Sequence, residues 1–177
     1  MNEEASKIFI LKVLKAFNEK NISVTKILLQ KFVYFSMLKN FYNLFRFQPY
    51  TYGPFSFDLA RQMERLVFWD KIKIDENNQV EVINYDDFEE SDEEMSGKIK
   101  DDIDAFMDML DSGLSFSTLE LIGTVMYCVD VLKKQEIPIT IENVTEEFRG
   151  WKGNKYLDHN ISEAFEKVKR TLPHLFE

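Results

Sequence analysis

Large apolar residues recur at three- and four-residue spacing near the start of the chain, which is the pattern of an amphipathic helix. They are Ile10, Val13, Leu14 and Phe17. The pattern predicts a first helix from about Glu3 to Asn18. A second helix is predicted over residues 26–40, with Ser23 or Thr25 as its N-terminal cap. Because residues 26–40 are apolar on nearly every side, we expect this helix to be central and buried.

The aromatic residues between positions 41 and 52 follow no clean period. They predict an irregular, partly extended segment that leads to Gly53. We expect Gly53 to adopt backbone angles that other residues avoid, and Pro54 to lie in the first turn of the helix that follows. Apolar residues at helical spacing predict that this third helix ends near Phe68. They are Phe55, Leu59, Met63 and Leu66.

Apolar and polar residues alternate on both sides of Asn77-Asn78, which predicts a two-stranded hairpin over residues 69–83. Three helices followed by a hairpin is the order of a winged helix-turn-helix. Residues 86–94 then hold seven acidic residues in nine, a composition that cannot pack into a core. We therefore predict an acidic linker over residues 84–95, between an N-terminal unit of residues 1–83 and a C-terminal unit of residues 96–177.

The C-terminal half shows helical spacing throughout. A fourth helix is predicted to end at Ser112-Gly113, and a fifth at about Lys134. The predicted caps of the last three helices are Ser117, with Glu120 at capping-box spacing, then Thr140 and Asp158. Residues 150–153 are placed between the last two helices. The predicted fold is mainly α with one β-hairpin, in which a helical C-terminal unit packs on a winged-helix-like N-terminal unit.

Composition supports packed helices, because the chain has sixteen Phe and seven Tyr but only six Gly. The net charge of -9 is uneven. Residues 1–83 carry 12 Lys and Arg against 9 Asp and Glu, whereas residues 84–177 carry 10 against 22. The acidic half argues against nucleic-acid binding over the whole surface and leaves the N-terminal half as the part that could bind it.

Cys128 is the single cysteine, so no internal disulfide is expected, and its apolar helical neighbours indicate a small buried side chain. No apolar run reaches the roughly 20 residues that span a bilayer, and the sequence begins without a signal-peptide pattern. We therefore expect a cytoplasmic protein without a membrane partner.

Three groups of residues are candidates for metal sites. Asp104, Asp108 and Asp111 fall on one predicted helix face and could hold a hard cation, but a solvated face is the favoured interpretation. Residues 75–79 imitate the start of a calcium loop, yet Val80 stands where the sharp turn requires glycine, which favours a hairpin turn. His159 and His174 have no partners at zinc-ligand spacing. We expect no metal or other cofactor.

The sequence also lacks the patterns of common catalytic sites. Ser56 and Ser117 lie at predicted helix starts, where serine caps are common, and neither has the Gly-x-Ser-x-Gly context of a hydrolase nucleophile. The six glycines form no phosphate-binding loop. We expect no enzyme and no catalytic residue.

A resemblance to known families is carried by Gln30-Lys31, Tyr34 and Tyr52-Gly53-Pro54, followed by the hairpin and the helix that contains residues 119–127. The chain resembles the Panacea (SocA-like) and YwgA-like proteins of prokaryotes and their mobile elements. Panacea proteins typically have Trp beside Tyr-Gly-Pro, where this chain has Tyr50 and Thr51, and this favours the YwgA-like branch. The resemblance to Panacea proteins implies antitoxins that neutralise toxins by binding them, or a proteolytic adaptor, whereas the YwgA-like branch adds no further function. The resemblance brings no catalytic residue.

We therefore expect a non-enzymatic regulator that binds another protein, such as a toxin encoded nearby. Aromatic residues between positions 41 and 57 exceed what one small core needs: Phe41, Tyr42, Phe45, Phe47, Tyr50, Tyr52 and Phe57. The predicted partner-binding residues are Tyr50, Tyr52, Phe57, Arg61, Gln62 and Arg65.

The alternative is a winged-helix DNA-binding transcriptional regulator. In that case Ser56, Arg61, Gln62 and Arg65 would face a groove, and Lys71 and Lys73 would contact phosphates. Two observations argue against this alternative. Asp58 and Glu64 lie on the same predicted helix, and the excess of positive charge in residues 1–83 is small for a protein that binds duplex DNA.

Overall fold

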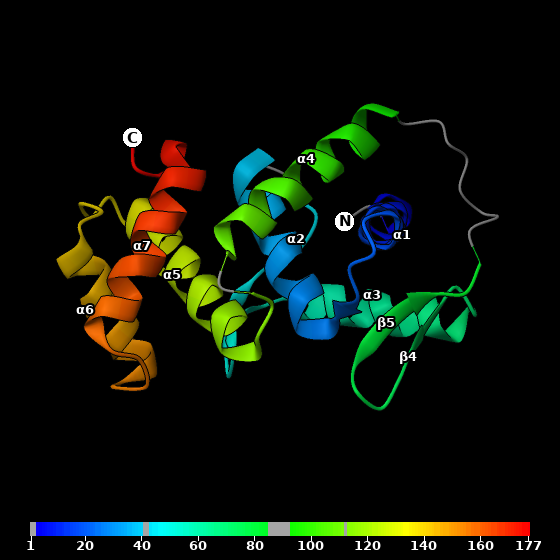
Figure 1. The fold of residues 1–177 in the computed structure, drawn as a ribbon, viewed down its shortest axis with the longest axis horizontal. Helices are drawn as coiled ribbons and strands as arrows, with labels where there is room; N and C mark the ends of the chain where they lie inside the picture. The colour runs from blue at the N-terminus through cyan, green and yellow to red at the C-terminus, as the bar shows by residue number, and fades with distance from the viewer. Residues whose placement is uncertain (1–2, 41–42, 85–92, 112) are drawn as a thin grey trace. The chain divides into compact units, whose positions relative to one another are not determined.

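Residues 3–40, 43–84, 93–111 and 113–177 are described by the structure, a computed structural model of the chain. It is mainly helical, with two small β-sheets (Figure 1). The predicted fold class is confirmed. The chain divides into two units: residues 1–48 with 56–104, and residues 49–55 with 105–177. Residues 85–92, most of the predicted acidic linker, lie outside the described residues.

Three helices and a three-stranded sheet form most of the first unit, together with the first part of α4 (Glu93–Met109). The helices are α1 (Glu3–Glu19), α2 (Lys26–Asn40) and α3 (Phe57–Phe68). The strands are β1 (Val24–Thr25), β4 (Ile72–Ile74) and β5 (Gln79–Val82), in the order β1-β5-β4. Figure 1 shows α3 beside the β4–β5 hairpin. The three helices and the hairpin follow the predicted order, whereas β1 was not predicted.

The second helix, α2, is the buried centre of the first unit, as its apolar sequence predicts. Thr25 caps it, since its Oγ1 accepts a hydrogen bond of 3.2 Å from the Leu28 amide. The side chain of Gln30 joins α2 to the start of α3 through two bonds to the Ser56 backbone: Nε2 donates to the carbonyl at 3.0 Å and Oε1 accepts from the amide at 2.9 Å. Ser56 in turn caps α3 through a 3.1 Å bond from the Leu59 amide.

The predicted hairpin is confirmed, with Ile72 opposite Val82 and Ile74 opposite Val80. Its turn is stabilised by Asp75, whose carboxylate accepts 2.8 Å hydrogen bonds from the backbone amides at 77 and 79. The Asn78 backbone has a φ of 60°, a conformation that asparagine tolerates better than most residues. Asp75 therefore serves the turn, in agreement with the favoured interpretation of residues 75–79.

The second unit contains the end of α4, three further helices and residues 49–55 of a two-stranded sheet. The helices are α5 (Phe116–Lys134), α6 (Ile141–Lys152) and α7 (Asp158–Thr171), and a short 3-10 helix (Pro173–Leu175) follows. The strands are β2 (Gln48–Tyr50) and β3 (Gly53–Phe55). Helices α5, α6 and α7 pack against one another, as Figure 1 shows, around buried side chains that include Val125, Val129, Phe148 and Phe165.

Several predicted helix ends are wrong. Ser115, not Ser117, caps α5 by accepting a 3.1 Å bond from the Thr118 amide. Residues 150–152 belong to α6 and not to a loop. Asp158 does not cap α7, where Leu157 occupies the cap position without a side-chain bond. Gly53 has the expected positive φ of 96°, but the neighbouring proline lies in β3 and not in the first turn of α3. The Thr140 cap is confirmed.

None of the helices in the described part of the chain has the length and apolar character needed to cross a membrane.

Candidate partner-binding site

Three aromatic side chains of the second unit are about half exposed: Tyr50, Tyr52 and Phe116 each expose 48%. The Tyr52 ring packs edge-on against Phe116 with centroids 4.7 Å apart, and Tyr50 packs on Phe55 at 5.2 Å. We call these four residues the aromatic hairpin surface. They come from the β2–β3 hairpin and from the first residue of α5. Exposed rings that are already ordered suit recognition, because tyrosine presents an apolar face and a polar hydroxyl.

A buried carboxylate lies in the same unit, on the second turn of α5. The side chain of Glu120 is only 1% exposed. It accepts hydrogen bonds from Lys152 Nζ at 3.0 Å, from Lys155 Nζ at 2.7 Å and from the Tyr156 hydroxyl at 3.0 Å. These four residues form the Glu120 network. Burying a charge is costly unless it is paired and hydrogen-bonded, and here the carboxylate has two ammonium groups and a hydroxyl.

The Glu120 network also holds the turn between β2 and β3. Lys152 Nζ donates a 2.6 Å hydrogen bond to the carbonyl of Thr51. Lys155 Nζ lies 5.8 Å from the centroid of the Tyr52 ring, within the range of a cation–π contact. The same two ammonium groups therefore contact both the buried Glu120 carboxylate and the β2–β3 hairpin. These contacts fix the position of Tyr52 relative to α5.

The protonation states of Glu120 and Tyr156 are stable near neutral pH. Burial acts to raise the pKa of Glu120, but hydrogen bonds from Lys155, Lys152 and Tyr156 outweigh it and hold that pKa below its ordinary value. Burial and the bond to the Glu120 carboxylate raise the pKa of Tyr156. The carboxylate stays charged and the phenol stays neutral, so this arrangement acts as a structural tie and not as an acid–base pair.

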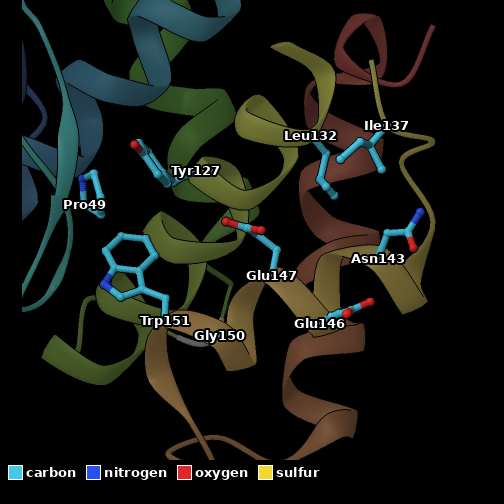
Figure 2. Close-up of a pocket in the computed structure, with 9 residues that line it drawn as sticks. All are labelled: Pro49, Tyr127, Leu132, Ile137, Asn143, Glu146, Glu147, Gly150 and Trp151. Carbon is cyan, nitrogen blue, oxygen red and sulfur yellow. The ribbon is translucent and has the colours of Figure 1, made fainter. Parts of the chain in front are cut away.

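A hollow of about 660 Å³ opens on the second unit between α5 and α6. It is lined by Pro49, Tyr127, Leu132, Ile137, Asn143, Glu146, Glu147, Gly150 and Trp151. Figure 2 shows Tyr127 and Trp151 on one side, Leu132 and Ile137 on the other, and the Glu147 carboxylate between them. The Tyr127 and Trp151 rings meet edge-to-face with centroids 5.3 Å apart. The hollow thus combines an aromatic wall with carboxylates.

The predicted partner-binding residues are divided between the two units. Tyr50 and Tyr52 lie on the aromatic hairpin surface, while Phe57, Arg61, Gln62 and Arg65 lie on α3 of the first unit. Phe57 is 45% exposed. Gln62 is buried and donates a 3.4 Å bond to the Glu3 carbonyl, so its amide is not presented at the surface.

The cations of the predicted DNA-binding face are largely paired with acids of their own unit. Arg61 lies 3.9 Å from Asp58, Arg65 lies 2.5 Å from Glu3, and Lys73 lies 2.7 Å from Glu81. Lys71 is partly buried, and Ser56 is fully buried as the cap of α3. Ser56 and Gln62 are therefore not placed to face a groove.

The three acids weighed as a cation site are exposed, in agreement with the favoured interpretation of a solvated face. Asp104 binds Lys20 at 2.6 Å, and Asp111, which lies beyond the end of α4, binds Lys167. Over residues 3–40, 43–84, 93–111 and 113–177, no three His, Cys, Asp or Glu side chains are grouped so that they could hold a metal ion. Phe41 and Tyr42 lie outside the described residues, and Phe45 is buried in the core.

Sequence reasoning missed the Glu120 network and the hollow. The spacing predicts Glu120 as part of a capping box and places residues 150–153 between two helices, and neither pattern indicates a buried ion pair. A usable signal was present, because Glu120 is the only charged residue among the first fourteen of α5. An isolated acid in an otherwise apolar helix predicts a buried partner.

No protein-family model matches the chain, and no curated protein matches it in sequence. Its function is therefore inferred from the geometry of the site.

Proposed function

We propose that this chain is a non-enzymatic regulator that binds another protein, in an antitoxin-like or adaptor role, through the aromatic hairpin surface. One observation carries the proposal: half-exposed aromatic side chains are held over a buried, fully paired charge network. The hairpin is tied at its turn by Lys152, and its exposed tyrosine is packed between Phe116 and Lys155.

Such a surface is suited to binding because its side chains are already ordered. Association costs free energy for every side chain that must be immobilised, and rigid aromatic anchors reduce that cost. Tyrosine is also enriched among the few interface residues that carry most of the binding energy. Contacts with Lys152 and Lys155 already order the hairpin in the free protein, so binding a partner does not have to immobilise it.

The resemblance to Panacea and YwgA-like proteins supports a binding role, since it implies antitoxins and an adaptor. The chemistry of the Glu120 network points the same way. Its carboxylate is saturated by three donors, and its pKa is held low, so it is poorly suited to take a proton from a substrate.

Affinity purification of the tagged chain from its native host tests this proposal. We expect one protein to co-purify with the tagged wild-type chain in a near-stoichiometric amount. The variant Tyr52→Phe, which keeps the aromatic ring, should recover as much of this protein as the wild type does. Tyr52→Ala is expected to reduce recovery at least tenfold, because a tyrosine anchor contributes about 2 kcal/mol or more. Arg61→Glu, on α3, reports whether the first unit also takes part.

Equal recovery with wild type and Tyr52→Ala would contradict the site. Absence of any stoichiometric partner from the wild type, over the growth conditions of the host, would contradict the function. Circular dichroism of each variant separates a lost contact from a lost fold.

A second candidate, a DNA-binding regulator, is favoured by the order of three helices and a β1-β5-β4 sheet in the first unit. The acid pairs of Arg61, Arg65 and Lys73 argue against it. Titration with salt, using DNA from the chain's own promoter, distinguishes the two, because a duplex binder loses affinity steeply as salt rises. No binding at low salt would exclude this candidate.

A further inference from the structure

Two carboxylates line the hollow, those of Glu146 and Glu147. Neither carboxylate forms a side-chain hydrogen bond or ion pair with any residue that the structure describes. Some acids of the second unit are paired, as Asp130 is with Lys134 at 2.7 Å and Asp158 is with Arg149. Exposed acids such as Glu142 have no ion pair among the described residues either, so what distinguishes Glu146 and Glu147 is that they line the hollow. The hollow is therefore a place where an added positive charge would find carboxylates that are not neutralised.

The negative charges beside the hollow affect Tyr127 of its aromatic wall and the neighbouring Cys128. Burial raises the pKa of Tyr127, and the nearby charges of Asp130 and Glu147 raise it further. Burial also raises the pKa of Cys128, and Glu147 again adds to the effect. Burial disfavours charge of either sign, so only the smaller contributions of Asp130 and Glu147 report the negative field of nearby carboxylates.

The Trp151 ring already takes part in a cation–π contact. Lys152 Nζ lies 5.0 Å from the centroid of the ring. That ammonium is hydrogen-bonded to Glu120 and to the Thr51 carbonyl, so its charge is compensated by a carboxylate outside the hollow. The carboxylates of Glu146 and Glu147 remain available to a ligand.

We infer that this hollow binds an arginine side chain presented by the protein partner. The inference rests on the proposed function and specifies the chemistry of the partner. A guanidinium group is planar, stacks on aromatic rings and binds carboxylates through paired N–H donors, which matches a wall of Trp151 and Tyr127 beside Glu147. The volume of about 660 Å³ falls within the range of ligand pockets and admits neighbouring residues of a peptide as well.

Fluorescence of Trp151 provides a direct test, because the chain has only two tryptophans. In the full chain carrying Trp69→Phe, Trp151 is the only indole reporter. The probes are acetyl-Gly-Arg-Gly-amide, the same peptide with citrulline, which is neutral and nearly the same shape, and the same peptide with lysine. We expect saturable quenching by the arginine peptide, with citrulline at least about tenfold weaker, which corresponds to about 1.4 kcal/mol.

Variants of the carboxylates complete the test. Glu146→Gln with Glu147→Gln is expected to weaken the arginine peptide at least about tenfold. Glu142→Gln is the matched control, because Glu142 is an exposed acid of the same helix that does not line the hollow. Equal affinity for arginine and citrulline, equal affinity for lysine, or no effect of the double variant would each overturn the inference.

The inference and the proposed function can fail separately. If a partner is recovered through Tyr52 but the arginine peptide does not bind, the hollow has been misassigned and the binding function stands. If the arginine peptide binds but no partner is ever recovered, the hollow is confirmed as a guanidinium site and the proposed function is wrong.

Discussion

Glu120→Gln is the substitution that most strongly tests how the aromatic hairpin surface is held. Glutamine has nearly the same shape as glutamate but no charge. It would leave the ammonium of Lys152, whose side chain is 6% exposed, without its carboxylate and with the Thr51 carbonyl as a remaining partner. Lys155 loses less from the substitution, because its side chain is 48% exposed and its ammonium group can be solvated by water instead.

The expected cost follows from these exposures. Removing one partner of a buried ion pair costs about 3–5 kcal/mol, because it leaves an uncompensated charge. The half-exposed Lys155 adds little, since exposed pairs contribute about 0–1 kcal/mol. Glutamine retains one carbonyl acceptor, so we expect the lower end, about 3 kcal/mol of unfolding free energy. For a chain of 177 residues this corresponds to a fall in Tm of about 6–12 °C.

Thermal unfolding at pH 7, followed by Trp151 fluorescence in the Trp69→Phe background, reports on the second unit that contains the Glu120 network. Glu142→Gln is the control, and a solvent-exposed substitution of this kind should change stability by less than about 0.5 kcal/mol. A loss below about 1 kcal/mol for Glu120→Gln would refute the interpretation that the buried carboxylate holds the lysines in place.

The stabilisation by the Glu120 carboxylate should also depend on pH. Because the folded pKa of Glu120 lies below its ordinary value of 4.5, its stabilisation is complete above pH 4.5 and is lost as the pH falls through the lowered folded value. The difference in stability between the wild type and Glu120→Gln should therefore be constant from pH 6 to 8 and shrink below about pH 4.5. A difference that grows as the pH falls would contradict the sign of the shift.

Three further predictions concern single side chains. Gln30→Glu removes the donor to the Ser56 carbonyl and should cost about 1–3 kcal/mol in urea unfolding, whereas an unchanged midpoint would contradict the role of that bond. Ser56→Ala removes the cap of α3 and should cost about 1 kcal/mol by the same measurement; no loss would place the helix start elsewhere. Burial raises the pKa of Cys128 to about 12, so at pH 8 its thiol should react with an aromatic disulfide reagent only as fast as the unit opens, and rapid reaction in native buffer would contradict its burial.

The sequence predicted most helices and the hairpin because their apolar spacing is a local property. The start of α5 shows the limit, because both Ser115 and Ser117 have cap chemistry and Ser115 is the cap. The Glu120 side chain, which the capping box would direct back to the helix start, instead binds Lys152 and Lys155, far along the chain. Similarly, Gly150 suggested a loop, yet α6 continues through it, because packing exceeds the cost of about 1 kcal/mol for a helical glycine.

The candidate site was predictable only in part. The crowding of aromatic residues drew attention to Tyr50 and Tyr52, which are half exposed, but composition does not tell a core ring from a surface ring, and Phe45 proves to be buried. The spacing of residues 50–65 suggested one continuous surface, whereas the chain passes from the second unit to the first between residues 55 and 56. Which unit a residue joins depends on tertiary contacts that a local pattern does not contain.

Photo-crosslinking in living cells of the native host tests the central claim most directly. Benzoylphenylalanine at position 50 samples the aromatic hairpin surface, and the same residue in place of Phe68, which is 83% exposed on the first unit, samples another apolar surface. The account predicts one protein adduct from position 50, lost when Tyr52→Ala is added and kept with Tyr52→Phe. An adduct from position 68 alone, or from neither position, would contradict it.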